Sequence, residues 1–189
     1  EKLIPRVESL KIGTSIDPSA DYGPLVTREA VEKVKNYIDI GVKEGATLAV
    51  DGRGFKMQGY EKGFYMGGCL FDNVTKDMRI YKEEIFGPVL TAIPFKDEAD
   101  AIAKANDIAY GLSSYVWSEN LGRAHRVAAA IEAGMCFVNS QNVRDLRQPF
   151  GGTKASGTGR EGGTWSYEVF LEPKNVAVSL GAHHIPHWG

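Results

Sequence analysis

The sequence has few cysteines, little net charge and no long hydrophobic run. Its two cysteines, Cys69 and Cys136, are too few for a disulfide framework and are typical of a reducing cytosol. A net charge of −2 provides no basic surface for nucleic acid or anionic membrane. No apolar run approaches the roughly 18 residues of a membrane helix, and no apolar signal-peptide region follows residues 1–6. These absences favour a cytoplasmic protein that binds neither nucleic acid nor membrane.

The sequence also lacks an evident nucleophile or metal site. Both cysteines lie among apolar residues with no histidine nearby, which predicts buried thiols of raised pKa. Three of the four histidines stand in the C-terminal segment HHIPH (183–187), where Pro186 prevents a helical arrangement and no acid or cysteine joins them. We therefore predict no catalytic residue and no metal ligand in this chain.

Segments of helical and extended character alternate along the chain. The expected helices cover residues 1–10, 28–44, 98–105 and 119–132, and the expected strands cover residues 47–50, 64–74, 89–95, 113–117 and 135–139. Thr27, Asp97 and Ser118 are the expected N-caps, and Gly45 and Gly134 the expected helix stops. This alternation predicts an α/β fold with a mostly parallel sheet and flanking helices. Ligands of such sheets bind beyond the carboxyl ends of the strands.

Residues 171–180 do not continue this pattern. Val176, Val178 and Leu180 alternate with Lys174, Asn175, Ala177 and Ser179. Such alternation predicts a strand outside the main sheet, which pairs with another sheet or with another subunit.

Two adjacent acids precede the expected strand at residues 89–95, in the turn EEIFGP (83–88). One carboxylate could accept hydrogen bonds from the vicinal hydroxyls of a ribose, and the ring of Phe86 could pack against a nicotinamide. The alternative is a solvated acidic turn with a phenylalanine in the core.

A polar loop with two arginines follows the expected strand at residues 135–139. Arg144 and Arg147 could hold a substrate carboxylate through charge-assisted hydrogen bonds. The alternative is a surface network of arginines around Asp145, which would contribute little.

Residues Gly157–Gly162 match the pattern G-x-G-x-x-G by letter. The phosphate-binding version of this pattern follows a strand directly, whereas a loop precedes it here. We therefore expect these glycines to let the backbone pass close to a site or partner.

Taken together, these motifs resemble the aldehyde dehydrogenase superfamily over essentially the whole chain. The motifs that carry the resemblance, in chain order, are EEIFGPV (83–89), Asn106 with YGLS (110–113), VW (116–117), GMCFVN (134–139) and PFGGTKASGTGREG (149–162).

The resemblance implies NAD-dependent oxidation of an aldehyde, with NADP not excluded. Glu84 would hold the nicotinamide ribose and Phe86 would pack near the nicotinamide ring. Phe150 and the loop from Arg144 to Arg147 would line the aldehyde tunnel. Residues 1–170 would be part of the catalytic domain. Leu171–Leu180 would join a neighbouring subunit in a homo-oligomer, a dimer or a tetramer, and residues 171–189 would form this strand and tail.

The family's nucleotide domain, general-base glutamate and nucleophilic cysteine would lie upstream of Glu1. We therefore expect a fragment or one half of a split enzyme, inactive alone, which folds and self-associates. Residues 1 to about 90, with GATLAVDGRGF (45–55), resemble the coenzyme A-acylating methylmalonate-semialdehyde branch. Residues from about 91, with RDLRQPF (144–150) and HHIPHWG (183–189), resemble the 5-carboxymethyl-2-hydroxymuconate-semialdehyde branch. A chimera or a natural intermediate would combine the two, and the second half indicates a carboxylated semialdehyde as substrate.

Overall fold

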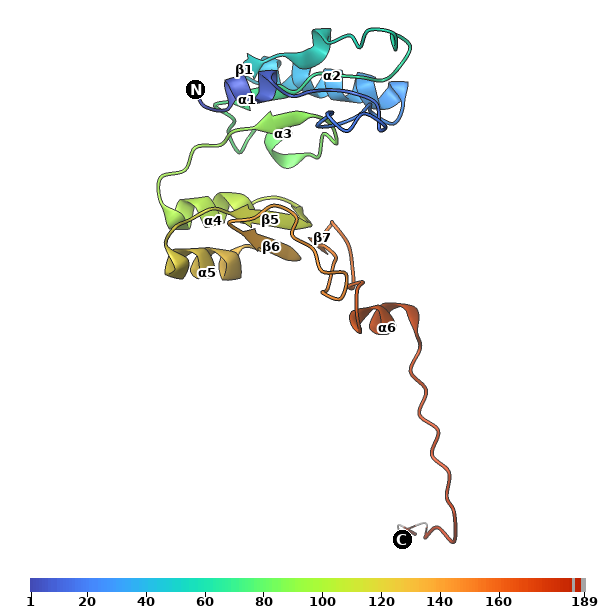
Figure 1. The fold of residues 1–189 in the computed structure, drawn as a ribbon. Helices are drawn as coiled ribbons and strands as arrows, with labels where there is room; N and C mark the ends of the chain where they lie inside the picture. Colours follow the sequence, from blue (N-terminus) through green and yellow to red (C-terminus); the bar gives the residue numbers. More distant parts are fainter. Residues whose placement is uncertain (185, 188–189) are drawn as a thin grey trace. The chain divides into compact units, whose positions relative to one another are not determined.

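The computed structural model describes residues 1–184, 186 and 187 (Figure 1). The chain divides into two compact units, one of residues 1–109 with 129–131 and one of residues 110–128 with 132–189. Helices and sheets alternate along the chain, which confirms the expected α/β class. The functional boundary expected near residue 170 stays a prediction.

The first unit is built on a three-stranded sheet with the order β1-β2-β3. Its strands are β1 (Thr47–Val50), β2 (Cys69–Asp72) and β3 (Val89–Thr91), and its helices are α1 (Ile4–Glu8), α2 (Arg28–Lys43), α3 (Arg79–Lys82) and α4 (Glu98–Asn106), with a 3-10 turn at Gly52–Gly54. Strand β2 pairs antiparallel with β1 and parallel with β3. The β1 pairing is a difference from the mostly parallel sheet expected, since β1 runs into β2 through a loop and not through a crossover helix.

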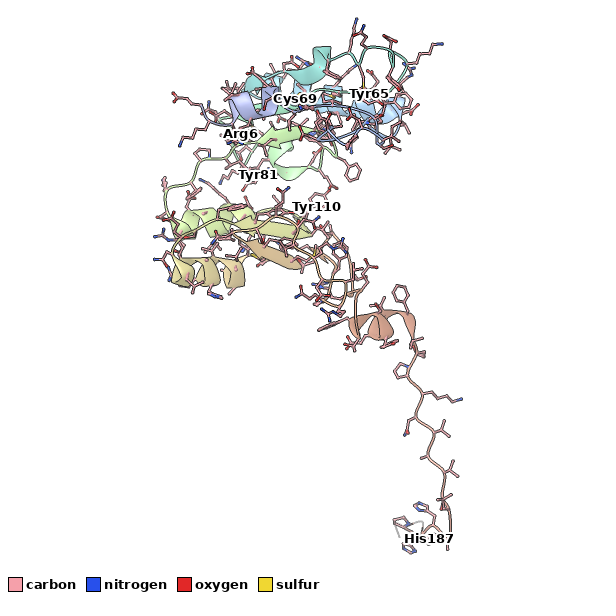
Figure 2. The ribbon with its side chains drawn as sticks, in the orientation of Figure 1. Arg6, Tyr65, Cys69, Tyr81, Tyr110 and His187 are labelled. Atoms are coloured by element: carbon pink, nitrogen blue, oxygen red, sulfur yellow. The ribbon has the colours of Figure 1, made fainter. Side chains whose placement is uncertain are left out.

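The core of the first unit lies between α2 and the sheet. Val34, Ile38 and Phe71 are fully buried in one hydrophobic cluster. Gly41 permits this packing, because a Cβ there would come within 2.9 Å of the Phe71 ring. The hydroxyl of Tyr81 in α3 (labelled in Figure 2) donates a hydrogen bond to the Lys104 carbonyl at 3.0 Å and so connects α3 with α4.

The helix ends of the first unit follow local sequence signals. The Thr27 Oγ1 atom accepts a hydrogen bond from the Ala30 amide at 3.1 Å and begins α2. Gly45, with φ of 96°, follows the last turn of that helix. Asp97 accepts from the Asp100 amide at 2.9 Å and begins α4. All three predictions are confirmed.

The second unit contains two short two-stranded sheets. Its strands are β4 (Tyr110–Gly111), β5 (Ser113–Val116), β6 (Met135–Val138) and β7 (Thr153–Lys154), and helices α5 (Leu121–Ala130) and α6 (Trp165–Phe170) complete the element order. Strands β5 and β6 are parallel, as expected for strands joined through a helix, whereas β4 and β7 are antiparallel.

The expected N-cap of α5, Ser118, is wrong. Asn120 caps this helix, because its Oδ1 atom accepts from the Arg123 amide at 2.9 Å. Ser118 instead lies two residues beyond the end of β5: its amide donates to Asn139 Oδ1 at 2.9 Å, and Asn139 Nδ2 donates back to the Ser118 carbonyl at 2.9 Å. The two residues therefore join the carboxyl ends of β5 and β6.

Residues 171–180 are exposed and extended in Figure 1, and they pair with no strand among the described residues of this chain. A strand requires a partner, so the predicted intersubunit strand stays a prediction. None of the helices in the described ranges is long and apolar enough to cross a membrane. Residues 185, 188 and 189 of the histidine-containing tail lie outside the described residues.

Candidate functional site

The turn between α3 and β3 presents one carboxylate and one aromatic ring to its surroundings. Ile85 is buried in the core, whereas Phe86 is 74% exposed and Glu84 is also exposed. The core position expected under the alternative interpretation thus belongs to Ile85 and not to Phe86. Phe86 has a φ of 57°, a conformation that is unusual for a bulky residue. Such conformations concentrate at functional sites, where the surrounding structure maintains them.

The two adjacent acids of this turn have different roles. Glu83 accepts hydrogen bonds from Arg79 Nε at 2.9 Å and from the Tyr37 hydroxyl at 2.6 Å. These bonds, that of Arg79 first, lower the pKa of Glu83 to about 2. The Glu84 carboxylate, by contrast, has no hydrogen-bond partner within the described residues, and only its carbonyl is contacted. Glu84 is therefore the carboxylate available to a ligand.

A cavity of about 660 Å³ lies in the second unit, beside β6 and the loop that follows it. Arg144 and Phe150 both line this cavity, and the Arg144 guanidinium lies 4.2 Å from the centroid of the Phe150 ring. Apolar residues of the wall include Met135, Val143 and Leu146. The cavity therefore combines an apolar surface with one cationic group stacked on an aromatic ring.

Arg147 is placed differently from Arg144. It is not among the residues that line the cavity, its side chain is 85% exposed, and its Nε atom donates to Asp145 Oδ1 at 2.9 Å. This hydrogen bond lowers the pKa of Asp145 and raises that of Arg147. The surface pairing around Asp145 that was considered for this loop thus exists, and of the two arginines it is Arg147 that takes part in it.

The glycine-rich segment after Phe150 supports the cavity wall. Phe150 and Glu161 exchange backbone hydrogen bonds at 2.7 and 2.9 Å, which hold Phe150 in position. Gly162, with φ of 98°, lies so close to the Gln148 carbonyl that a Cβ would overlap it. Glu161 and Gly162 also line the cavity, a role that their letters alone did not indicate.

The two cysteines differ in their surroundings. Cys69 is buried, as predicted, and burial raises the pKa of its thiol, while the Gly52 amide donates to its Sγ at 3.2 Å (Figure 2). Cys136 is only half-buried and lines the cavity, which corrects the prediction of a buried thiol. Its β6 neighbours are partly exposed, because this short sheet has only two strands. Across the described ranges, no cluster of His, Cys, Asp or Glu could hold a metal ion.

Comparisons with known proteins agree with the motifs. The aldehyde dehydrogenase family matches residues 1–176. The chain is 42% identical over 187 residues to betaine aldehyde dehydrogenase of Brucella anthropi, a match that covers 99% of this chain and 38% of that protein. Among solved structures, HpcC of Thermus thermophilus superposes with a TM-score of 0.89 at 43% identity, over 100% of this chain and 37% of that one.

A further solved structure bears on the cofactor and on the expected branch. A putative methylmalonate-semialdehyde dehydrogenase of Sinorhizobium meliloti 1021, complexed with NAD, has a TM-score of 0.84 at 43% identity, over 90% of this chain and 35% of that one. The chain thus spans less than two fifths of the length of these relatives. The match over residues 1–176 and the 42% identity over 187 aligned residues establish that this chain belongs to the aldehyde dehydrogenase family.

Proposed function

We propose that this chain supplies the nicotinamide-ribose contact and part of the aldehyde tunnel of an NAD-dependent aldehyde dehydrogenase. The observation that carries the proposal is the turn at residues 83–87, which exposes a carboxylate and an aromatic ring two residues apart in the sequence, the carboxylate having no hydrogen-bond partner in the part of the chain that the structure describes. The solved relative complexed with NAD has the same fold over 90% of this chain.

The residues of the turn fit the cofactor. The Glu84 carboxylate would accept hydrogen bonds from the two ribose hydroxyls, since an ionised carboxylate has several acceptor positions. The exposed ring of Phe86 would pack against the nicotinamide and limit its orientations. A bound nicotinamide would supply the acceptor for the hydride that leaves the aldehyde carbon on oxidation. The thiol that attacks the aldehyde belongs, under this proposal, to a part of the enzyme that these residues do not match.

For the substrate we propose a carboxylated semialdehyde bound at the cavity of the second unit. Arg144 would pair with the distant carboxylate, because it lines the cavity, and Phe150 would contact the carbon chain. Arg147 is the second candidate for the carboxylate, provided that it leaves Asp145. The free cysteines fit a cytoplasmic location.

A segment exchange tests the proposed function. In a hybrid enzyme, residues 1–189 replace the segment of Thermus thermophilus HpcC that they match. We expect the hybrid to reduce NAD with an aldehyde, and we expect Glu84→Gln to raise the KM for NAD about tenfold or more, since a charge-assisted contact contributes about 1.5–3 kcal/mol. Asp72→Asn, which changes an exposed acid at the end of β2, is the matched control. A folded hybrid in which Glu84→Gln leaves the KM for NAD unchanged contradicts the proposed role. Analysis of the product formed in the presence of coenzyme A then shows whether the hybrid produces an acid or a thioester.

The tail supports a second candidate function, self-association of a chain that is inactive alone. Val176, Val178 and Leu180 are 69%, 72% and 100% exposed, and their alternation suits a strand that a second copy would cover. Sedimentation of the purified 189-residue chain, together with an NAD-reduction assay, tests this candidate. An inactive oligomer is the expected result, and an active monomer would contradict it.

A further inference from the structure

Helix α2 contacts both ends of the turn at residues 83–87. At the first end, the Tyr37 hydroxyl donates to Glu83 Oε2 at 2.6 Å and Lys33 Nζ donates to the Glu84 carbonyl at 3.4 Å. At the other end, Val34 packs so close to Gly87 that a Cβ on Gly87 would overlap its Cγ2 atom. Residues 33, 34 and 37 lie on one face of the helix, so this face contacts the turn at Glu83, Glu84 and Gly87.

Helix α3 adds a cation to these contacts. The Arg79 guanidinium binds both oxygens of Glu83, with Nε–Oε1 of 2.9 Å and Nη2–Oε2 of 2.8 Å. The same guanidinium lies 5.4 Å from the centroid of the Tyr37 ring. Glu83 is thus held by two partners from two helices, and a bidentate pair of this kind fixes direction as well as distance.

These contacts explain how Phe86 keeps its left-handed conformation. A bulky residue with φ of 57° is strained and returns to negative φ unless its neighbours prevent it. Glu83 is held three residues before Phe86, Ile85 is buried in the core and Gly87 is fitted against Val34. Between these fixed points the chain turns with the ring of Phe86 directed outward, where it is 74% exposed.

We propose that Tyr37, Arg79 and Glu83 are positioning residues, which set the orientation of Glu84 and Phe86 for the cofactor without touching it. This inference rests on the proposed function for the roles of Glu84 and Phe86. The contacts with Tyr37 and Arg79 are features of the first unit alone, so their effect on Phe86 is measurable without a cofactor.

The first experiment measures the conformation of Phe86 in the 189-residue chain by NMR, with labelled phenylalanine and Phe86→Leu to assign the signal. We expect carbon shifts typical of positive φ in the unchanged chain. Glu83→Gln and Tyr37→Phe should each shift the equilibrium about fivefold toward negative φ, which is the scale of a partly exposed charged contact. Arg79→Lys should shift it less than Arg79→Met, because lysine retains the charge.

Glu32→Gln is the matched control. It removes one exposed carboxylate from α2, the helix that carries Tyr37. This carboxylate pairs with Lys35 at 3.0 Å and not with the turn. The Phe86 signal should not move in this variant. Equal signals in the unchanged chain, Glu83→Gln and Tyr37→Phe would overturn the inference, as would an equal shift in Glu32→Gln.

A second experiment, in the hybrid enzyme, separates this inference from the proposed function. We expect Glu83→Gln to raise the equilibrium dissociation constant of NAD, measured by calorimetry, about fivefold while the KM for aldehyde stays unchanged. If Glu84→Gln weakens NAD binding and Glu83→Gln does not, the positioning inference is wrong and the proposed function stands. If Glu83→Gln moves the Phe86 signal and Glu84→Gln leaves NAD binding unchanged, the cofactor role is wrong and the conformational effect stands.

Discussion

The guanidinium of Arg144 lies 4.2 Å from the centroid of the Phe150 ring, and both side chains line one cavity. Three residues further along, Arg147 is paired with Asp145 and lies outside that lining. The contact with Phe150 places a permanent cation at an apolar wall without neutralising it, since an aromatic ring carries no net charge. Arg144 is therefore able to pair with an anionic substrate, whereas Arg147 would first have to leave its own carboxylate.

This difference predicts a selective effect on substrates in the hybrid enzyme. Arg144→Gln should raise the KM for a carboxylated semialdehyde about ten- to a hundredfold, because a charge-assisted contact is worth about 1.5–3 kcal/mol, and should leave a neutral aldehyde unchanged. Arg147→Gln, at the second candidate position, should change neither KM by more than about threefold, because its guanidinium is already paired with Asp145. Steady-state kinetics with a matched pair of aldehydes decides this, and equal effects on both substrates would reject the carboxylate role of Arg144.

The core of the first unit predicts a large effect on stability. Phe71 is fully buried between α2 and the sheet, so Phe71→Ala should reduce the free energy of unfolding by about 3–5 kcal/mol. Phe95→Ala, at a position that is 64% exposed, should change it by less than about 0.5 kcal/mol. Urea unfolding followed by circular dichroism measures both values. Similar values for the two variants would show that the buried cluster is not the core of this unit.

The lowered pKa of Glu83 predicts an acid-dependent loss of stability. Its pKa falls from the ordinary 4.5 to about 2 in the folded chain, so its ionised form contributes stability above pH 4.5. That contribution should decline as pH falls from 4.5 and should vanish near pH 2. The difference in Tm between the unchanged chain and Glu83→Gln, measured across this range, isolates the contribution of Glu83, because the other acids titrate in both proteins. A difference that stays constant from about pH 6 down to about pH 2 would contradict the prediction.

The alternating tail predicts an oligomer that depends on backbone pairing. Ala177→Pro combined with Val178→Pro removes two neighbouring N–H donors, one of which must face any partner strand, and should dissociate the oligomer. Ser179→Ala keeps every backbone donor and is the matched control. Sedimentation velocity distinguishes the two variants. Persistence of the oligomer in the proline variant would place the subunit contact elsewhere.

Parts of the fold could be predicted because their causes are local. Thr27 and Asp97 accept hydrogen bonds from amides three residues away, and Gly45 follows α2 with positive φ, so a short stretch of sequence contains each whole interaction. The same reasoning failed at Ser118, where Asn120, two residues later, is an equally good cap. The choice depended on Asn139, which binds Ser118 from 21 residues away and holds it just beyond the end of β5.

The sequence by itself determined the family, the α/β class and the residue types at the candidate site: two acids and a ring before β3, and two arginines after β6. Only the tertiary structure decided which of each pair is available to a ligand. Glu83 is paired with Tyr37, 46 residues away, and Arg147 with Asp145, which leaves Glu84 without a partner in the described chain and Arg144 at the cavity. The left-handed Phe86 also had no local signal, since phenylalanine disfavours positive φ on its own. Contacts with distant segments hold the strained Phe86, and the folded geometry of each turn decides which of two neighbouring charges pairs with a partner.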